Sequence, residues 1–141
     1  MRRLMVLLVA ILPVAQGAAR AQGVSDTLPE SVVSQAYEAF NRHEPAAFLA
    51  YFAPVWHYTA LGDTAARPRR HTREQELRDY LAVDAFRSKP TITVVRRLVV
   101  GPYVIDEQLR GRDSTRRLDI FEVRQGKIVH EWESGPIPKS P

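Results

Sequence analysis

Between residues 27 and 54, apolar residues recur at the spacing of α-helices. Thr27-Leu28-Pro29-Glu30 has the Thr-x-x-Glu form of a capping box, which starts a helix. The apolar residues after it follow i, i+3, i+4, i+7 spacing, at Val33, Ala36, Tyr37 and Phe40. This pattern predicts an amphipathic helix over residues 28–42. A shorter apolar stripe at Phe48, Leu49 and Phe52, between Pro45 and Pro54, predicts a second helix.

A strand and a third helix follow, separated by a polar stretch. Residues 55–61 are rich in aromatic and β-branched side chains, which predicts a strand. Residues 62–71 are basic and contain a proline, so we expect them to form a loop. Thr72-Arg73-Glu74-Gln75 is a second capping-box pattern. The stripe of Leu77, Tyr80 and Leu81 after it predicts a helix that runs to about Phe86.

From residue 91 onward the period of the pattern changes to two. Residues 91–100, 103–110, 116–123 and 127–133 are predicted to be four strands. The links between them are Gly101-Pro102, residues 111–115 and Gln125-Gly126, and links this short join antiparallel neighbours. Helices early and strands late predict an α+β fold, in which three N-terminal helices pack on one face of a curved, mainly antiparallel sheet.

The N-terminal residues 1–21 have the pattern of a secretory signal peptide. Arg2 and Arg3 are followed by an apolar run from Leu4 to Ala15, and Ala19-Arg20-Ala21 fits the small-x-small cleavage rule. We expect cleavage before Gln22 and export to the periplasm or the exterior, with no stable membrane insertion afterwards. The alternative is an uncleaved membrane anchor, for which the run is short, since a spanning helix needs about 20 apolar residues.

Composition narrows the classes of protein further. The formal charge of +4 includes three arginines of residues 1–21, so the remainder carries a net charge of about +1 and shows no basic surplus of the kind that binds nucleic acid. The chain has no cysteine, which excludes disulfides although the expected destination is oxidising. The domain must therefore be held together by packing alone.

The order of the predicted elements and several local motifs resemble the nuclear-transport-factor-2-like superfamily, and within it the SnoaL-like and ketosteroid-isomerase-like small domains. The motifs are Ala36-Tyr37-Glu38-Ala39-Phe40-Asn41 with Pro45-Ala46-Ala47-Phe48, then Phe52-Ala53-Pro54-Val55-Trp56-His57, and the stretch from Leu118 to Trp132. The resemblance assigns residues 22–134 to one such domain and leaves 135–141 as an irregular tail.

The resemblance implies a sheet that curls into a cone-shaped half-barrel around a cavity, with helices closing its side. Members of the superfamily include isomerases, polyketide cyclases, dehydratases, epoxide hydrolases and binding modules without catalytic activity. Many of them form homodimers through the sheet, so a homodimer is expected here. The fold alone does not select a function, which must be argued from the site.

Strand alternation sorts the side chains by face and suggests candidates for chemistry. Residues that share a face form four largely apolar rows: Val55, His57, Thr59 and Leu61; Tyr103, Ile105, Glu107 and Leu109; Asp119, Phe121 and Val123; and Ile128, His130 and Trp132. Each row carries one ionisable group, namely His57, Glu107, Asp119 or His130, and a lone charge in an apolar row is costly unless it is paired or lines a wet cavity. If strand 103–110 shows its other face to the cavity, Asp106 replaces Glu107.

These groups have structural interpretations as well as catalytic ones. An acid among apolar neighbours has a raised pKa and can transfer protons near neutral pH, and a histidine paired with a carboxylate is a natural base. Equally, His57 could be satisfied by a backbone carbonyl, and His130 could lie at a dimer surface. Asp119 could form an ion pair with Arg96 or Arg97.

The aromatic residues Trp56, Tyr58, Trp132, Tyr37 and Tyr80 are expected in the core or in the cavity wall. The four histidines lack the spacing of metal ligands, so neither a metal nor a cofactor is predicted. The favoured function is a pocket for a small, mostly apolar molecule with cofactor-free acid/base chemistry of the isomerase, cyclase, lyase or hydrolase type. The alternative is a binding or dimerisation module without catalysis.

Overall fold

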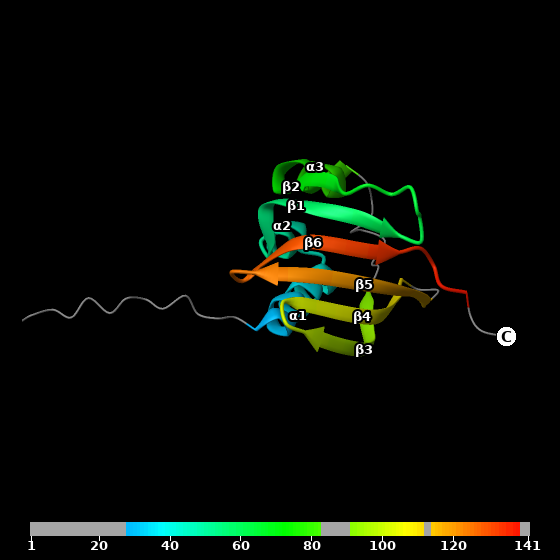
Figure 1. Cartoon of the computed structure of the whole chain (residues 1–141). Coiled ribbons are helices and arrows are strands. Elements are labelled where there is room, and N and C mark those ends of the chain that lie inside the picture. The colour runs from blue at the N-terminus through cyan, green and yellow to red at the C-terminus, as the bar shows by residue number, and fades with distance from the viewer. Residues whose placement is uncertain (1–27, 83–90, 112–113, 139–141) are drawn as a thin grey trace, which may run out of the picture.

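The computed structural model describes residues 28–82, 91–111 and 114–138, and shows three helices on the concave face of a curved six-stranded sheet (Figure 1). The helices are α1 (Pro29–Asn41), α2 (Pro45–Leu49) and α3 (Arg73–Ala82). The strands are β1 (Phe52–Leu61), β2 (Arg69–Thr72), β3 (Ile92–Val100), β4 (Tyr103–Arg110), β5 (Thr115–Arg124) and β6 (Lys127–Ser134). The predicted α+β architecture is therefore confirmed.

The strands lie in the order β2-β1-β6-β5-β4-β3, so β2 and β3 are edges and the sheet does not close into a barrel. All neighbours are antiparallel except β1 and β6, which are parallel. The predicted hairpins β3–β4, β4–β5 and β5–β6 are confirmed. In the last of them Gln125 and Gly126 both have positive φ, of 50° and 69°, as a tight two-residue hairpin turn requires.

The second helix is shorter than predicted. Phe52 belongs to strand β1, because the backbone carbonyl of Tyr51 already accepts a hydrogen bond from Ile128 N at 2.9 Å and so begins the pairing with β6. Pro54 lies inside β1, where the register against β6 shifts between Phe52 and His57. A strand tolerates proline at such an irregularity because no ladder hydrogen bond is needed from it there.

The third helix begins as predicted, since Thr72 Oγ1 accepts a hydrogen bond from Gln75 N at 3.3 Å. At the start of α1, Thr27 of the predicted capping box lies outside the described residues, and Leu28 occupies the N-cap position without a side-chain cap bond. The expected extension of α3 to Phe86 also lies outside them. Strand β2 was not predicted, because its four residues Arg69–Thr72 are polar and carry no apolar alternation.

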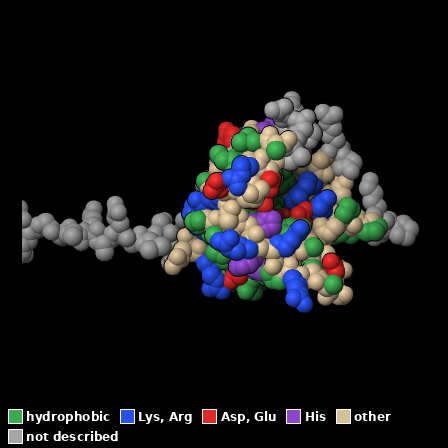
Figure 2. All heavy atoms as spheres, turned by 90° about the horizontal axis from the view of Figure 1, so that it is seen from above, with side chains coloured by type: hydrophobic (Ala, Val, Ile, Leu, Met, Phe, Trp, Pro, Cys, Tyr) green, Lys and Arg blue, Asp and Glu red, His purple; other side chains and the backbone are tan. Residues whose placement is uncertain are grey.

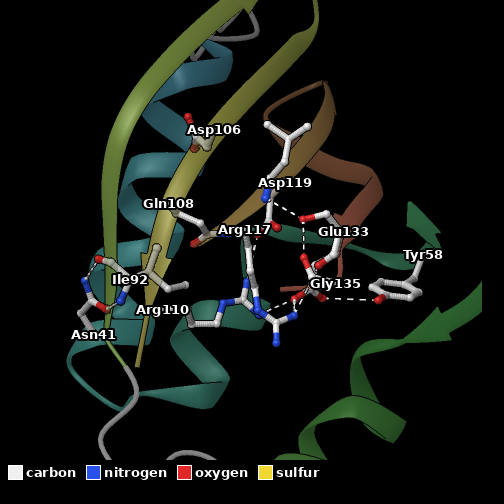
Figure 3. A network of polar contacts seen from close by, with 12 residues as sticks. Asn41, Tyr58, Ile92, Asp106, Gln108, Arg110, Arg117, Asp119, Glu133 and Gly135 are labelled. Carbon is white, nitrogen blue, oxygen red and sulfur yellow. Dashed lines mark hydrogen bonds and ion pairs between the residues drawn. The ribbon is translucent and has the colours of Figure 1, made fainter. Parts of the chain in front are cut away.

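The core lies between α1, α2 and the concave face of the sheet. Helix α1 buries its predicted stripe, including Val33, Ala36 and Tyr37. Two polar contacts fix this helix on the edge of the sheet. Asn41 exchanges two hydrogen bonds with the backbone of Ile92, accepting from N at 2.7 Å and donating to O at 2.9 Å (Figure 3).

The second contact is an ion pair whose carboxylate is buried. The Arg97 guanidinium donates to both carboxylate oxygens of Asp106, each at 2.7 Å, and also to Ser34 Oγ on α1 at 2.6 Å. Asp106 is fully buried, so the ion pair offsets the cost of removing its carboxylate from water.

Candidate functional site

A cavity of about 200 Å³ lies between the concave face of the sheet and the helices. Seen from above, acidic, basic and histidine side chains gather around a hollow in the surface (Figure 2). The apolar and aromatic part of the lining consists of Tyr37, Phe40, Phe48, Phe52, Trp56, Tyr58, Tyr80, Ile92 and Phe121. The ionisable part consists of Arg69, His71, Glu76, Arg110, Asp119, Glu131 and Glu133. The cavity thus combines aromatic walls with a concentrated set of charges.

The charges come from neighbouring strands whose inward rows are polar. Asp119 of β5 lies opposite Glu133 of β6, and Phe121 lies opposite Glu131. On β4 the inward row ends in Gln108 and Arg110. The concave face of β4, β5 and β6 therefore places three carboxyls beside an arginine.

An ion-pair network joins most of these groups (Figure 3). Arg110 donates to Asp119 Oδ2 at 2.9 Å and to Glu133 Oε1 at 2.7 Å. Arg117 donates to the same oxygen of Glu133 at 2.7 Å, and Tyr58 Oη donates to Glu133 Oε2 at 3.4 Å. Gln108 Nε2 donates to Asp119 Oδ2. These bonds fix the positions of Asp119 and Glu133 and leave Glu131 outside the network.

Glu131 has no ion-pair or hydrogen-bond partner among the described residues, although it is half-buried. Burial raises the pKa of its carboxyl to about 8, and the nearby charges of Asp119 and Glu133 add to the effect. Burial likewise raises the pKa of Asp119 to about 7, with Arg110 acting in the opposite direction. Glu131 is therefore mostly protonated at neutral pH, and Asp119 is close to its titration midpoint.

Three buried polar atoms of cavity-lining residues have no hydrogen-bond partner within the part of the chain that the structure describes. They are Asp119 Oδ1, the hydroxyl of Tyr37 and Arg110 Nε. Burial raises the pKa of Tyr37 well above its ordinary value, and the nearby Asp119 contributes, so this hydroxyl keeps its proton and can donate. A buried polar atom without a partner is costly, and the residues that carry these atoms line the cavity.

A second pair of ionisable groups lines the cavity from the β2–α3 side. His71 is on β2 and Glu76 is in the first turn of α3, and His71 Nδ1 is hydrogen-bonded to Glu76 Oε1. The histidine ring lies 5.6 Å from the ring of Trp56 and 5.7 Å from that of Tyr58, measured between centroids. His71 falls in residues 62–71, which were predicted to be a loop, so the sequence did not indicate this pair.

Five of the predicted site residues line the cavity: Asp119, Trp56, Tyr58, Tyr37 and Tyr80. Burial raises the pKa of Tyr80, so its hydroxyl is a donor. Asp106 also faces the concave side but does not line the cavity, because α1 covers it and Arg97 neutralises it. Asp119 forms its ion pair with Arg110, whereas Arg96 or Arg97 was expected.

Four residues predicted for the site lie on the outer face of the sheet, so the expectation that they reach the cavity is wrong. They are Glu107, His130, Trp132 and His57. Glu107 is bonded there to Arg96 at 3.1 Å and to Arg116. His130 stacks on Trp132 with a centroid distance of 3.7 Å, and its Nε2 lies 2.9 Å from Thr59 Oγ1. His57 is exposed, 5.7 Å from the His130 ring.

The physical reasons for these errors differ between strands. On β4 the inward row is the polar one, since Asp106 and Arg110 are compensated by ion pairs, and the apolar row with Ile105 faces outward. On β6 a register shift lies between the Val123–Ile128 and Glu122–His130 pairs, so the buried Ile128 and His130 do not share a face. The same shift turns Glu131 and Glu133 inward, which sequence alternation alone does not reveal.

Within the described residues, no group of three or more His, Asp or Glu side chains is arranged to hold a metal ion. The same part of the chain has no helix with the length and apolar character needed to cross a membrane.

The fold recurs in solved structures of low sequence identity. IdmH from Streptomyces antibioticus, a candidate polyketide cyclase, is 23% identical over 74% of this chain and 89% of its own, with a TM-score of 0.58. A candidate ketosteroid isomerase from Kribbella flavida is 17% identical over 80% of this chain and 81% of its own, with a TM-score of 0.61. A SnoaL-like protein of unknown function from Burkholderia thailandensis is 13% identical over 78% of this chain and 95% of its own, with a TM-score of 0.61. These identities establish the shared fold and no shared activity.

No curated protein matches the chain. The SnoaL-like domain family, however, matches residues 33–131, which is most of the chain. This stretch begins inside α1, includes strands β1 to β5 and ends at Glu131 inside β6. The chain therefore belongs to the SnoaL-like domain family and has the nuclear-transport-factor-2-like fold.

Proposed function

We propose that the cavity binds a small, mostly apolar molecule and transfers protons on it without a cofactor, in a reaction of the isomerase, cyclase, lyase or hydrolase type. One observation carries the proposal: two acids with raised pKa, Asp119 and Glu131, face an aromatic cavity. Two polar atoms of its lining residues, the Tyr37 hydroxyl and Asp119 Oδ1, have no partner among the described residues. Acids that titrate near neutral pH are suited to general acid/base catalysis.

The size of the cavity indicates the size of the ligand. Its volume of about 200 Å³ is only moderately larger than that of an apolar cavity of roughly 150 Å³ that holds benzene. A ligand with one ring and a short substituent fits, whereas a fused multi-ring ligand would require the walls to move. The aromatic rings would contact its apolar body, and the polar groups would orient one oxygen-containing substituent.

The roles of the acids follow from their protonation states. Glu131 is mostly protonated at neutral pH and can donate a proton to a ligand oxygen as charge develops there. The Tyr37 hydroxyl can donate a hydrogen bond to the same kind of oxygen. Asp119, held by Arg110 and Gln108, has one oxygen left to accept or donate.

Ligand binding is tested by thermal denaturation with a panel of single-ring ketones, phenols and epoxides, because a ligand bound only to the folded state raises the transition temperature. Proton transfer is tested with acetophenone in D₂O, by following loss of its methyl-proton signal by NMR. Glu131→Gln and Asp119→Asn should each lower the exchange rate by about 10²–10⁴-fold. Glu122→Gln is the matched control, since this half-buried glutamate lies on the outer face beside Arg124.

Two results would decide against catalysis. If members of the panel raise the transition temperature but wild-type protein exchanges no protons, the cavity is a binding site without catalytic activity. If no member of the panel binds, the cavity assignment itself is wrong.

We also propose that two copies of the chain associate through the outer face of the sheet. An apolar row crosses this face in register, through Leu98, Ile105, Ile120 and Trp132. Leu98 is 57% exposed, and a shallow groove of about 820 Å³ lies beside it, bounded by Ile137 and Pro138. An exposed apolar surface of this kind is typical of a protein interface.

We propose further that the chain is exported and that residues 1–21 are removed. The support is the sequence alone, namely the basic start, the apolar run and Ala19-Arg20-Ala21. The mass of the protein secreted by a bacterial host should correspond to a chain that starts at Gln22. A mass that retains residues 1–21 would contradict cleavage.

A further inference from the structure

We propose that His71 is a second proton-transfer residue of the cavity, acting as the base, and that Glu76 is its positioning residue. The inference rests on the proposed function, because it assigns a base to the same cavity in which Glu131 is the acid. Neither residue belongs to the ion-pair network of Asp119 and Glu133.

The fold brings the two residues together locally. His71 lies opposite Trp56 in the β1–β2 pairing, so both side chains face the concave side. Strand β2 passes directly into α3, and the first turn of this helix carries Glu76 back over the histidine. The side chains are 24% and 15% exposed, respectively, so the pair is partly shielded from water but open to the cavity.

The hydrogen bond assigns the two ring nitrogens different roles. A carboxylate can only accept, so Nδ1 must carry the proton that Glu76 Oε1 accepts. In the neutral ring Nε2 is then the acceptor, and it makes no hydrogen bond to another described residue. The rings of Trp56 and Tyr58 limit the rotation of the imidazole, which leaves a positioned base at the cavity wall.

Acid and base are on different walls. Glu131 enters from β6 and His71 from β2, on opposite sides of β1 in the sheet. In the step we propose, Nε2 takes a proton from a C–H bond beside a carbonyl of the ligand. The electron pair of that bond forms a C=C bond, and the carbonyl oxygen receives the proton of Glu131. This leaves an imidazolium, a carboxylate and an enol, and the reverse transfers restore both groups.

The pair is tested first without any ligand. In ¹⁵N-labelled protein, two-bond ¹⁵N–¹H spectra recorded across a pH series should show the neutral ring of His71 as the Nδ1–H tautomer. Glu76→Ala removes the acceptor and should raise the Nε2–H population. An Nε2–H tautomer in the wild type, or a spectrum unaffected by Glu76→Ala, overturns the positioning role.

The base is tested with the acetophenone exchange assay. His71→Gln should lower the exchange rate by about 10²–10⁴-fold. His43→Gln, in the link between α1 and α2, is the control and should keep the wild-type rate. One outcome would refute the base assignment alone: the wild type exchanges protons, the Glu131→Gln variant exchanges none, and the His71→Gln variant retains the full rate. The proposed function would then stand. If wild type itself exchanges none, both are wrong.

Discussion

Glu131 offers a test of the electrostatics of the cavity that needs no substrate. Its carboxyl has a pKa of about 8 in the folded protein and an ordinary value of 4.5 when exposed. Between these values the folded chain holds a proton that the unfolded chain releases. The unfolded state therefore binds fewer protons, and the free energy of unfolding must fall as the pH rises through this window. Glu131→Gln preserves the shape of the side chain and removes the titration.

The magnitude follows from linkage. With pKa values of 4.5 unfolded and about 8 folded, wild type should lose about 2.5 kcal/mol of unfolding free energy between about pH 5 and 7 through this group alone. The Glu131→Gln variant lacks this contribution. Relative to wild type it should therefore gain about 2.5 kcal/mol over the same interval. Asp119, with its pKa of about 7, also lowers the free energy of unfolding as the pH rises, and it does so in both proteins.

Urea denaturation followed by circular dichroism at fixed temperature measures the effect. With an m-value of about 1–2 kcal/mol/M, the difference between the two midpoints should change by about 1.2–2.5 M across the interval. Glu122→Gln, on the outer face, should retain the wild-type dependence on pH. Parallel curves for wild type and Glu131→Gln would show that Glu131 is not a buried neutral acid, and the acid/base proposal would lose its donor.

Two other predictions concern the scaffold. Asp106→Asn leaves the Arg97 guanidinium without its carboxylate, and should lower the free energy of unfolding in urea by about 3–5 kcal/mol; a loss below about 1 kcal/mol would indicate that the pair is solvated. Leu98→Glu places a charge on the apolar row of the outer face, and should convert a dimer to a monomer in light scattering while the circular dichroism spectrum is unchanged. A wild-type monomer, or a variant that retains the dimer mass, would contradict the proposed interface.

The helices and hairpins were predictable because their determinants are local. The apolar stripe of α1 gives its position to within a residue at each end, as 29–41 against the predicted 28–42. The glycine-containing links fix three antiparallel neighbours in the sheet, since a short link leaves no other arrangement. Strand β2 depends instead on pairing with β1, which no local pattern reveals.

The orientation of the strands was predictable only where the inward row is apolar. The row of Phe121 and Val123 on β5 faces inward, so Asp119 lies in the cavity as alternation indicates. On β4 the rule that apolar residues face inward fails, because Asp106 and Arg110 find partners on other elements that the sequence does not identify. On β1 the same rule, applied to the largest apolar side chains, gives the observed orientation. Phe52 and Trp56 are better core residues than Val55 and His57, and they face inward.

The ion pairs on the concave face distinguish Glu131 from the other acids there, which all have arginine partners. Asp106 is paired with Arg97, Asp119 with Arg110, and Glu133 with both Arg110 and Arg117. Glu131 is left without a cation among the described residues, and burial then makes it a neutral acid at a cost to stability. Packing alone would favour an apolar residue at position 131, like the buried Phe121 that lies opposite it on β5. A carboxyl that destabilises the fold but faces an open cavity is consistent with selection for proton transfer, because local conflicts with stability concentrate at functional sites.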